Sequence, residues 1–320
     1  MKLGVMGALF GKLKLDEALD YCNKVGLDAI ELPAGCYPGD PWQLQGIYKN
    51  KPALKELKAK IADHGLEVHG IAVHGNPVHP NKRMAAQHAK AHRDGVLLAA
   101  EFETVVINFS GCPGGSPLDK TPNWVTCPWP DDFSAIADYQ WNKVIIPFWK
   151  RENNFAAKHG VKIAFEAHPG MVLHNPEDIV RLRAAGGKAL GANLDPSHFF
   201  WQGIDPVEAA RFLGENKCIF HVHAKDCLID KRNSAIIGNL DIKSYGDVKN
   251  RAWVFRTCGY GHGDEFWKPF ISMLRLYEYD GVISIEHEDS LMSASEGFEK
   301  AVAYLKGIIL TQPTGQAWWF

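Results

Sequence analysis

The residues Lys-Ile-Ala-Phe-Glu at positions 162–166 form a short apolar run that ends in a carboxylate. Amphipathic stretches lie on both sides of this run, at residues 141–159 and 176–185. An apolar, β-rich run between two amphipathic helices is typical of a strand in a parallel sheet. Residues 162–166 are therefore predicted to form one strand of an α/β fold.

The same alternation of apolar runs and amphipathic stretches extends over nearly the whole chain. Further strands are predicted at residues 2–6, 29–32, 68–73, 104–108, 190–195, 219–223 and 282–286. Further helices are predicted at residues 15–25, 52–64, 83–99, 206–213, 266–274 and 295–310. No strand-to-helix turn carries a Gly-x-Gly-x-x-Gly fingerprint. Eight strand–helix units therefore favour a single closed (β/α)8 barrel, that is, a TIM barrel, over an open doubly wound sheet.

Two connections that follow predicted strands are too long to be simple turns. One covers residues 109–138 and is rich in proline, glycine and tryptophan, and the other covers residues 227–263. Because active sites of such barrels lie at the C-terminal ends of the strands, both connections are expected to cover the site. The barrel is expected to span residues 1–310. An apolar tail at 311–320 would then pack on the barrel or on a partner subunit.

The composition restricts the possible partners and location. A net charge of −2 gives no basic field for a nucleic-acid backbone. No apolar run approaches the length of about 20 residues that a membrane-spanning helix needs. The seven cysteines are odd in number and include no Cys-x-x-Cys pair, so they are predicted to be reduced thiols in the cytoplasm.

Ionisable residues end four consecutive predicted strands: Glu166, Asp195, His223 and Glu286. A single carboxylate at the end of a strand often only caps the next helix. Four ionisable side chains at the ends of neighbouring strands would instead converge on one rim of the barrel. Three carboxylates so close together repel one another unless a cation lies among them. Three oxygen donors and one nitrogen suit Mn²⁺, Mg²⁺ or Co²⁺ better than structural zinc. One catalytic divalent ion is predicted, with Mn²⁺ as the first choice.

The sequence around these positions resembles the xylose isomerase-like, or sugar phosphate isomerase/epimerase-like, TIM barrels, a superfamily that also includes endonuclease IV. The resemblance covers residues 1 to about 310, and its most specific parts are Phe-Glu-Ala-His-Pro-Gly (165–170), Asn-Leu-Asp-Pro-Ser-His (193–198), His-Val-His-Ala-Lys-Asp (221–226) and Ser-Ile-Glu-His-Glu (284–288). It implies that Glu166, Asp195, His223 and Glu286 bind one divalent metal ion. It also implies that His198 contacts the substrate.

The resemblance further implies an isomerase or epimerase of a small sugar. In such an enzyme a proton is removed next to a carbonyl, and a metal-bound enediolate forms. Glu166 and Glu286 would be the two proton carriers. Return of the proton to the neighbouring carbon gives isomerisation, whereas two bases on opposite faces give epimerisation.

Four further residues near the predicted rim are candidates for the site. His74 ends the third strand, and it could transfer a proton, hold a substrate hydroxyl or be structural. Asn108 ends the fourth strand and would suit a neutral hydrogen bond. His168 and Lys225 lie beside predicted ligands, and each could bind substrate or orient those ligands.

Other functions remain open from the sequence. The α subunits of bacterial C-glycoside deglycosidases resemble the chain in length and motifs. They imply a lyase that cleaves 3-keto-glycosides by β-elimination, together with a small second subunit. A homo-oligomer is otherwise expected. An endonuclease IV-like nuclease would need more histidines, including one at Asn108, and a non-enzymatic sugar-binding barrel would not need the four-ligand set.

Overall fold

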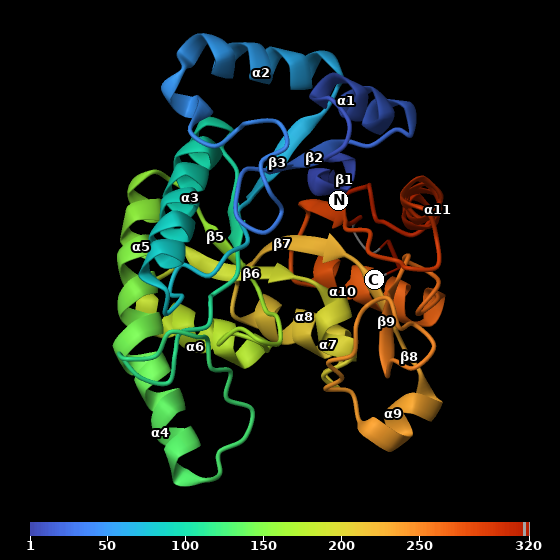
Figure 1. The fold of residues 1–320 in the computed structure, drawn as a ribbon. Coiled ribbons are helices and arrows are strands. Elements are labelled where there is room, and N and C mark those ends of the chain that lie inside the picture. Colours follow the sequence, from blue (N-terminus) through green and yellow to red (C-terminus); the bar gives the residue numbers. More distant parts are fainter. Residues whose placement is uncertain (316–317, 320) are drawn as a thin grey trace.

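The computed structural model of the chain describes residues 1–315 and 318–319. Eight parallel strands close into a barrel in which each strand neighbours the next along the chain (Figure 1). They are β1 (Lys2–Met6), β2 (Ala29–Pro33), β3 (Glu67–Ala72), β4 (Val106–Asn108), β5 (Ile163–Glu166), β6 (Leu190–Leu194), β7 (Ile219–Ala224) and β10 (Val282–Ile285). β10 pairs with β1 and completes the ring. The predicted (β/α)8 fold is confirmed.

Helices surround this barrel, and most of them follow the predicted pattern (Figure 1). They are α1 (Leu15–Lys24), α2 (Lys51–Asp63), α3 (Lys82–Glu101), α5 (Ile146–Lys158), α6 (Pro176–Gly186), α8 (Pro206–Glu215), α10 (Asp264–Leu276) and α11 (Ala294–Lys306). Polar side chains cap several N-termini: Asn81, Asn175, Asp205 and Ser293 each accept a hydrogen bond from a backbone N–H of the first turn. Such a cap contributes about 1 kcal/mol to a helix.

The barrel core consists of the apolar side chains of these short strands. Leu3, Ile30, Ile163, Leu190 and Ile283 are each at most 1% exposed. Strands of a parallel sheet are covered on both faces, which explains why their sequences read as continuous apolar runs. Each apolar run ends where its strand reaches the rim of the barrel. The polar side chains that follow these runs therefore lie together at the rim.

Both long connections contain more regular structure than a plain loop. α4 (Asp131–Tyr139) begins within residues 109–138 and continues through the π-helical segment η3 (Gln140–Ile145) into α5. In the second connection, β8 (Asp226–Ile229) and β9 (Trp253–Arg256) pair as an antiparallel ribbon. The short helix α9 (Lys231–Ile237) lies between the two strands.

The buried carboxylate of Asp226 fixes the base of this ribbon. It accepts hydrogen bonds from the backbone N–H groups of Gly259, Gly261 and His262, and from the indole N–H of Trp267 on α10. Hydrogen bonds to a charged acceptor are stronger than neutral ones. The segment after β9 is therefore tied to the end of β7, next to Lys225.

The remaining sequence-based expectations concern termini, membranes and thiols. α11 ends at Lys306, earlier than predicted. In the tail, Trp318 is largely exposed, and residues 316, 317 and 320 lie outside the described residues. Within the part of the chain that is described, no helix is both long and apolar enough to cross a membrane. All seven cysteines are free thiols.

Candidate active site and metal centre

The four strand-end residues meet at one rim of the barrel. Glu166 ends β5, Asp195 directly follows β6, His223 lies near the end of β7, and Glu286 directly follows β10. One ligand atom from each of the four lies within 4.8 Å of those of the other three. Glu166, Asp195 and His223 are buried, and Glu286 is partly buried. The convergence that the sequence predicts is present.

The donor atoms of this cluster fit a divalent cation. Asp195 Oδ2 is buried and has no hydrogen-bond partner among the described residues, although Lys225 Nζ and His198 Nε2 lie 3.2 and 3.4 Å away. Glu166 Oε2 and Glu286 Oε2 lie 3.0 and 3.4 Å from His223 Nδ1. A buried carboxylate oxygen without a partner is costly. Carboxylate and imidazole donors around one point match Mn²⁺, Mg²⁺ and related ions.

Glu166 is held by hydrogen bonds from several directions. His198 Nε2 lies 3.1 Å from its Oε1, whereas His74 Nε2 and Asn193 Nδ2 lie 3.2 and 2.9 Å from its Oε2. Burial raises the pKa of Glu166, but His74, His198 and His223 outweigh burial and hold the pKa well below its usual range. Glu166 is therefore an ionised carboxylate in a fixed orientation.

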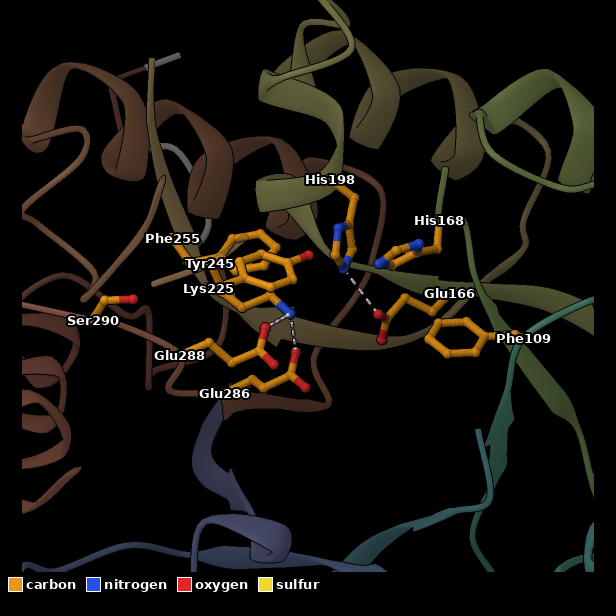
Figure 2. Close-up of a pocket in the computed structure, with 10 residues that line it drawn as sticks. All are labelled: Phe109, Glu166, His168, His198, Lys225, Tyr245, Phe255, Glu286, Glu288 and Ser290. Carbon is orange, nitrogen blue, oxygen red and sulfur yellow. Dashed lines mark hydrogen bonds and ion pairs between the residues drawn. The ribbon is translucent and has the colours of Figure 1, made fainter. Parts of the chain in front are cut away.

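Lys225 lies buried among three carboxylates. Its Nζ is 2.5 Å from Glu286 Oε2 and 3.0 Å from Glu288 Oε2, as drawn in Figure 2. Burial lowers the pKa of Lys225, but Asp195, Glu286 and Glu288 raise it well above its usual range. The ammonium group is therefore a fixed positive charge beside the metal-ligand candidates. It also lies 4.7 Å from the centre of the Phe255 ring.

Six of the predicted site residues line two adjoining cavities, whereas Asp195, His223 and Asn108 line neither. The first has a volume of about 320 Å³, and Figure 2 shows its lining, which includes His168, His198 and Lys225. The second, of about 310 Å³, includes His74. Both cavities share Phe109, Glu166, Glu286 and Glu288. The polar rim is therefore accessible to a small molecule from two sides. We refer to this pair of cavities as the inner site.

His168 and Asn108 have different positions relative to the inner site, because His168 is half-buried and lines it, whereas Asn108 is buried. Burial lowers the pKa of His168 to about 3, so its ring in the inner site is neutral. Asn108 is fully buried and lines neither cavity of the inner site. Its Oδ1 accepts hydrogen bonds from the backbone N–H groups of Gly75 and Phe109. These contacts place Asn108 behind the lining of the inner site, and its contact with substrate stays a prediction.

Several residues that contact the site were not singled out from the sequence as substrate or metal residues. Glu31 Oε2 lies 2.9 Å from His223 Nε2, and Asn193 also contacts Glu166. Glu288, Tyr245 and Phe255 line the first cavity. Glu31 is the middle residue of β2, and an ionisable residue within an apolar strand is the one sequence signal for it. Tyr245 lies in the ribbon connection, about 20 residues after Lys225 and far from any strand-end motif.

A third cavity of about 300 Å³ opens beside the inner site. His168 and Tyr245 line both this cavity and the first one. The rest of its lining comes from the two long connections, from Pro169 and Gly170 after β5, and from the segment around α7 (Pro196–Phe200). Its rings are those of Trp124, Trp201, Tyr245 and Trp253. We refer to it as the outer cavity.

Comparisons with known proteins agree with this architecture. The family model described as xylose isomerase-like TIM barrel matches residues 19–308. The uncharacterized protein YfiH of Bacillus subtilis (strain 168) is 36% identical over 318 residues, which are 97% of this chain and 99% of YfiH. The inosose dehydratase of Geobacillus thermodenitrificans (strain NG80-2) is 24% identical over 256 residues, which are 79% of this chain and 80% of that enzyme.

Solved structures show the same fold. A D-tagatose 3-epimerase-like protein superposes with a TM-score of 0.64 at 21% identity, covering 96% of this chain and 98% of its own. The IOLI protein with a bound zinc atom superposes with a TM-score of 0.65 at 18% identity, covering 97% of this chain and 98% of its own. At these identities the likeness concerns the fold. On the evidence of the family model and of YfiH, the chain belongs to the xylose isomerase-like TIM barrels.

Proposed function

We propose that the protein is a divalent-metal-dependent enzyme that removes and returns a proton next to the carbonyl of a sugar, as keto-sugar isomerases and epimerases do. One observation carries this proposal: two carboxylates, Glu166 and Glu286, reach the same cavity from strands that lie three places apart in the barrel, with His223 between them. Proton transfer at carbon needs bases in fixed positions inside a cavity that admits the substrate.

The metal-binding part of the proposal assigns Glu166, Asp195, His223 and Glu286 as ligands of one ion. When bound there, the ion would supply electrophilic stabilisation of the negative charge that develops on the oxygens of the substrate. Mn²⁺, Mg²⁺ and Co²⁺ all suit the donor set, and a protein of similar fold holds zinc. The deuterium-exchange experiment described below therefore compares several metal ions.

The residues of the chain have distinct roles in the proposed reaction. Glu166 accepts the proton from the carbon next to the carbonyl, and the electron pair of that C–H bond moves to the carbonyl oxygen. Lys225 lies beside Glu286 and stabilises the negative charge on that oxygen. Glu286 then returns a proton, either to the neighbouring carbon or to the other face of the same carbon.

Three histidines orient the substrate and Glu166. His74 and His198 each contact one oxygen of Glu166, and each lines one cavity of the inner site. They therefore hold the carboxylate in one orientation and can exchange a proton with a substrate hydroxyl. His168 lies against His198, with 4.1 Å between ring centres, and is placed to contact the same substrate.

The names of related proteins are consistent with proton abstraction beside a carbonyl. Dehydration of an inosose and epimerisation of a ketose can both begin with this step. The 24% identical relative is named for the first reaction, and the structural neighbour is named as similar to an enzyme of the second. The two outcomes differ only in the steps after proton removal.

A second candidate is β-elimination from a 3-keto-glycoside, the lyase reaction. Here the proton at C2 moves to Glu166, a C1–C2 double bond forms, and the bond from C1 to the aglycone breaks as the aglycone takes a proton from an acid such as His198. The outer cavity favours this candidate, because it offers space for an aglycone beside His168 and Tyr245, which also line the first cavity together with Glu166 and His198.

Deuterium exchange tests the shared first step. The protein is loaded with Mn²⁺, Mg²⁺ or Co²⁺ and incubated in D₂O with ketoses, keto-inositols and 3-keto-glycosides, and the products are followed by NMR. We expect deuterium at the carbon next to the carbonyl. Glu166→Gln and Glu286→Gln should slow this exchange at least about 100-fold, whereas the exposed Glu17→Gln should not. Exchange that is equally fast in Glu166→Gln and in the native protein would refute the role of Glu166, and release of a free aglycone would identify the lyase.

A further inference from the structure

We propose that the outer cavity binds a ring-bearing, apolar substituent of the substrate. The substrate is then a conjugated sugar, such as a glycoside with an aromatic aglycone, rather than a free or phosphorylated monosaccharide. This inference rests on the proposed function, because it assigns the sugar to the inner site and its substituent to the outer cavity.

The lining of the outer cavity has the chemistry of an aromatic-binding pocket. Four rings, those of Trp124, Trp201, Tyr245 and Trp253, contribute to its wall, together with the apolar side chains of Leu240 and Ile242. A volume of about 300 Å³ is at the lower end of cavities that hold small organic molecules. Aromatic walls offer stacking and edge-to-face contacts to a ring, each contributing about 0.5–1.5 kcal/mol beyond area burial.

The outer cavity adjoins the place where chemistry is proposed to occur, because His168 and Tyr245 line both. Tyr245 lines both cavities, and its ring stacks on Phe255 at 5.9 Å between centres. Phe255 in turn lies under the ammonium group of Lys225. Figure 2 shows the Tyr245 and Phe255 rings side by side behind Lys225. A substrate whose sugar contacts Lys225 therefore has its next substituent at the Tyr245 ring.

The ring cluster is held in position before any ligand arrives. Trp201 and Trp253 stack at 4.4 Å between centres. The buried guanidinium of Arg251 lies 4.5 Å from the Tyr245 ring centre and 4.4 Å from that of Trp253, and its Nε donates to the backbone carbonyl of Trp253. Such cation–π contacts orient both rings. A wall with fixed rings loses little conformational entropy when a ligand binds.

Stability alone does not explain these tryptophans. The indole N–H groups of Trp124, Trp201 and Trp253 are all buried and have no hydrogen-bond partner among the described residues. Each unpaired buried donor costs the protein stability, so a phenylalanine would serve a purely structural cluster better. Trp201 and Trp253 are buried against each other, whereas Trp124 is half-buried, so Trp124 is the one of the three with most ring surface left for a ligand.

The charged side chains around the outer cavity are Asp241, Lys243 and Arg251, and Nη2 of the buried Arg251 has no hydrogen-bond partner among the described residues. Asp241 and Lys243 pair with each other, with 3.2 Å between Oδ1 and Nζ. The faces of aromatic rings carry partial negative charge, which repels an anion. The aromatic faces favour an uncharged ring, whereas Arg251 would attract an anion, so the sugar phosphate is the decisive competitor in the binding experiment.

Binding of simple glycosides tests the inference without any turnover. Isothermal titration calorimetry of the Mn²⁺-loaded protein compares phenyl β-D-glucopyranoside, methyl β-D-glucopyranoside and α-D-glucose 1-phosphate. We expect the phenyl glycoside to bind about tenfold more tightly than the methyl glycoside, and the phosphate to bind no more tightly than the methyl glycoside. Trp124→Ala and Tyr245→Ala should bring the ratio of phenyl to methyl affinity close to one.

Two matched variants control for general effects on the long connections. Trp129 lies in the same connection as Trp124 and Tyr260 follows the same ribbon as Tyr245, but both side chains are exposed and neither lines the outer cavity. Trp129→Ala and Tyr260→Ala should keep the tenfold ratio. Equal affinity for both glycosides, no measurable binding of the phenyl glycoside, or a ratio that survives in Trp124→Ala and Tyr245→Ala would overturn the inference. A failed deuterium exchange with an intact binding ratio would instead refute only the proposed reaction.

Discussion

His223 and Glu31 form a buried pair behind the candidate metal centre. His223 Nε2 lies 2.9 Å from Glu31 Oε2, while His223 Nδ1 faces Glu166 on the other side of the ring. Ser284 also donates a hydrogen bond to Glu31. A carboxylate that accepts Nε2–H selects the imidazole tautomer whose Nδ1 has a free lone pair. Glu31 is thus placed to position His223. Glu31, His221 and His223 also form a second buried group whose ligand atoms lie within 4.8 Å of one another.

Replacing Glu31 should weaken metal binding without removing any ligand. We expect Glu31→Gln to lower the affinity for Mn²⁺ by about 10–100-fold, the usual effect of losing such a supporting carboxylate, as measured by competition with a metal-sensitive dye. Glu67→Gln, at the opposite end of the adjacent strand β3, is the matched control. Unchanged affinity in Glu31→Gln would show that His223 does not depend on this contact.

Metal removal should lower the thermal stability of the protein. A ligand that binds only the folded state at about 100 times its Kd adds about 2.7 kcal/mol. We therefore expect Tm to rise by several degrees with Mn²⁺ and to fall back when a chelator is added, as followed by differential scanning calorimetry.

Asp195→Asn separates this effect from structural damage. The Asp195 side chain caps α7, and asparagine caps a helix equally well, so the fold should remain. The shift of Tm with metal should nevertheless disappear, because a carboxylate ligand is lost. A full shift in Asp195→Asn would exclude this residue as a ligand.

Lys225→Met should separate catalysis from metal binding. The substitution removes a buried positive charge from among three carboxylates, so the affinity for a divalent cation should stay the same or rise. The rate of proton exchange should fall by about 100-fold or more, because a group that stabilises developing negative charge is lost. Loss of metal binding with an unchanged exchange rate would contradict this role.

Asp289 should contribute a pH-dependent part of the stability. Burial raises its pKa, but hydrogen bonds from the backbone N–H groups of Thr257 and Leu291 and the guanidinium of Arg256 lower it below its usual range overall. A lowered folded-state pKa stabilises the protein above the unfolded value of about 3.9, and this stabilisation is lost as the pH falls through the folded-state pKa.

The corresponding experiment compares urea unfolding of the native protein and Asp289→Asn. The variant should lose about 2 kcal/mol of unfolding free energy at pH 7, and the difference should shrink when the pH falls below about 4. Asp20→Asn, at an exposed position, should change stability by less than about 0.5 kcal/mol at either pH. A difference that stays constant between pH 7 and pH 3 would contradict the expected ionisation.

The barrel and the convergence of its strand ends were predictable because both depend on local sequence. An apolar run that stops at Glu166 or Glu286 marks the end of a strand, and parallel strands place all such ends on one rim. The predicted and observed bounds of a strand differ slightly where hydrogen-bond pairing with its neighbours decides where the strand begins. β4, for example, starts at Val106 rather than at residue 104, because its register with β3 and β5 begins at Val106.

The surroundings of the rim were less predictable, because they depend on contacts between distant parts of the chain. Asn108 ends its strand just as Glu166 does, but its amide binds the backbone N–H groups of Gly75 and Phe109. The β8–β9 ribbon has no short turn between its strands, so no hairpin signal marks it. Tyr245 and Trp201 are 44 positions apart in the sequence and come together only through this ribbon.

The ribbon starts one residue after Lys225, and its tip, residues 238–251, contributes Leu240, Ile242, Tyr245 and Arg251 to the outer cavity. The groups proposed to move protons lie on the barrel, whereas these four lie on an excursion anchored by Asp226. The sequence of the tip can therefore vary without changing the residues proposed to move protons. Grafting a different sequence between β8 and β9 should change which sugar conjugates are accepted while the reaction itself is retained.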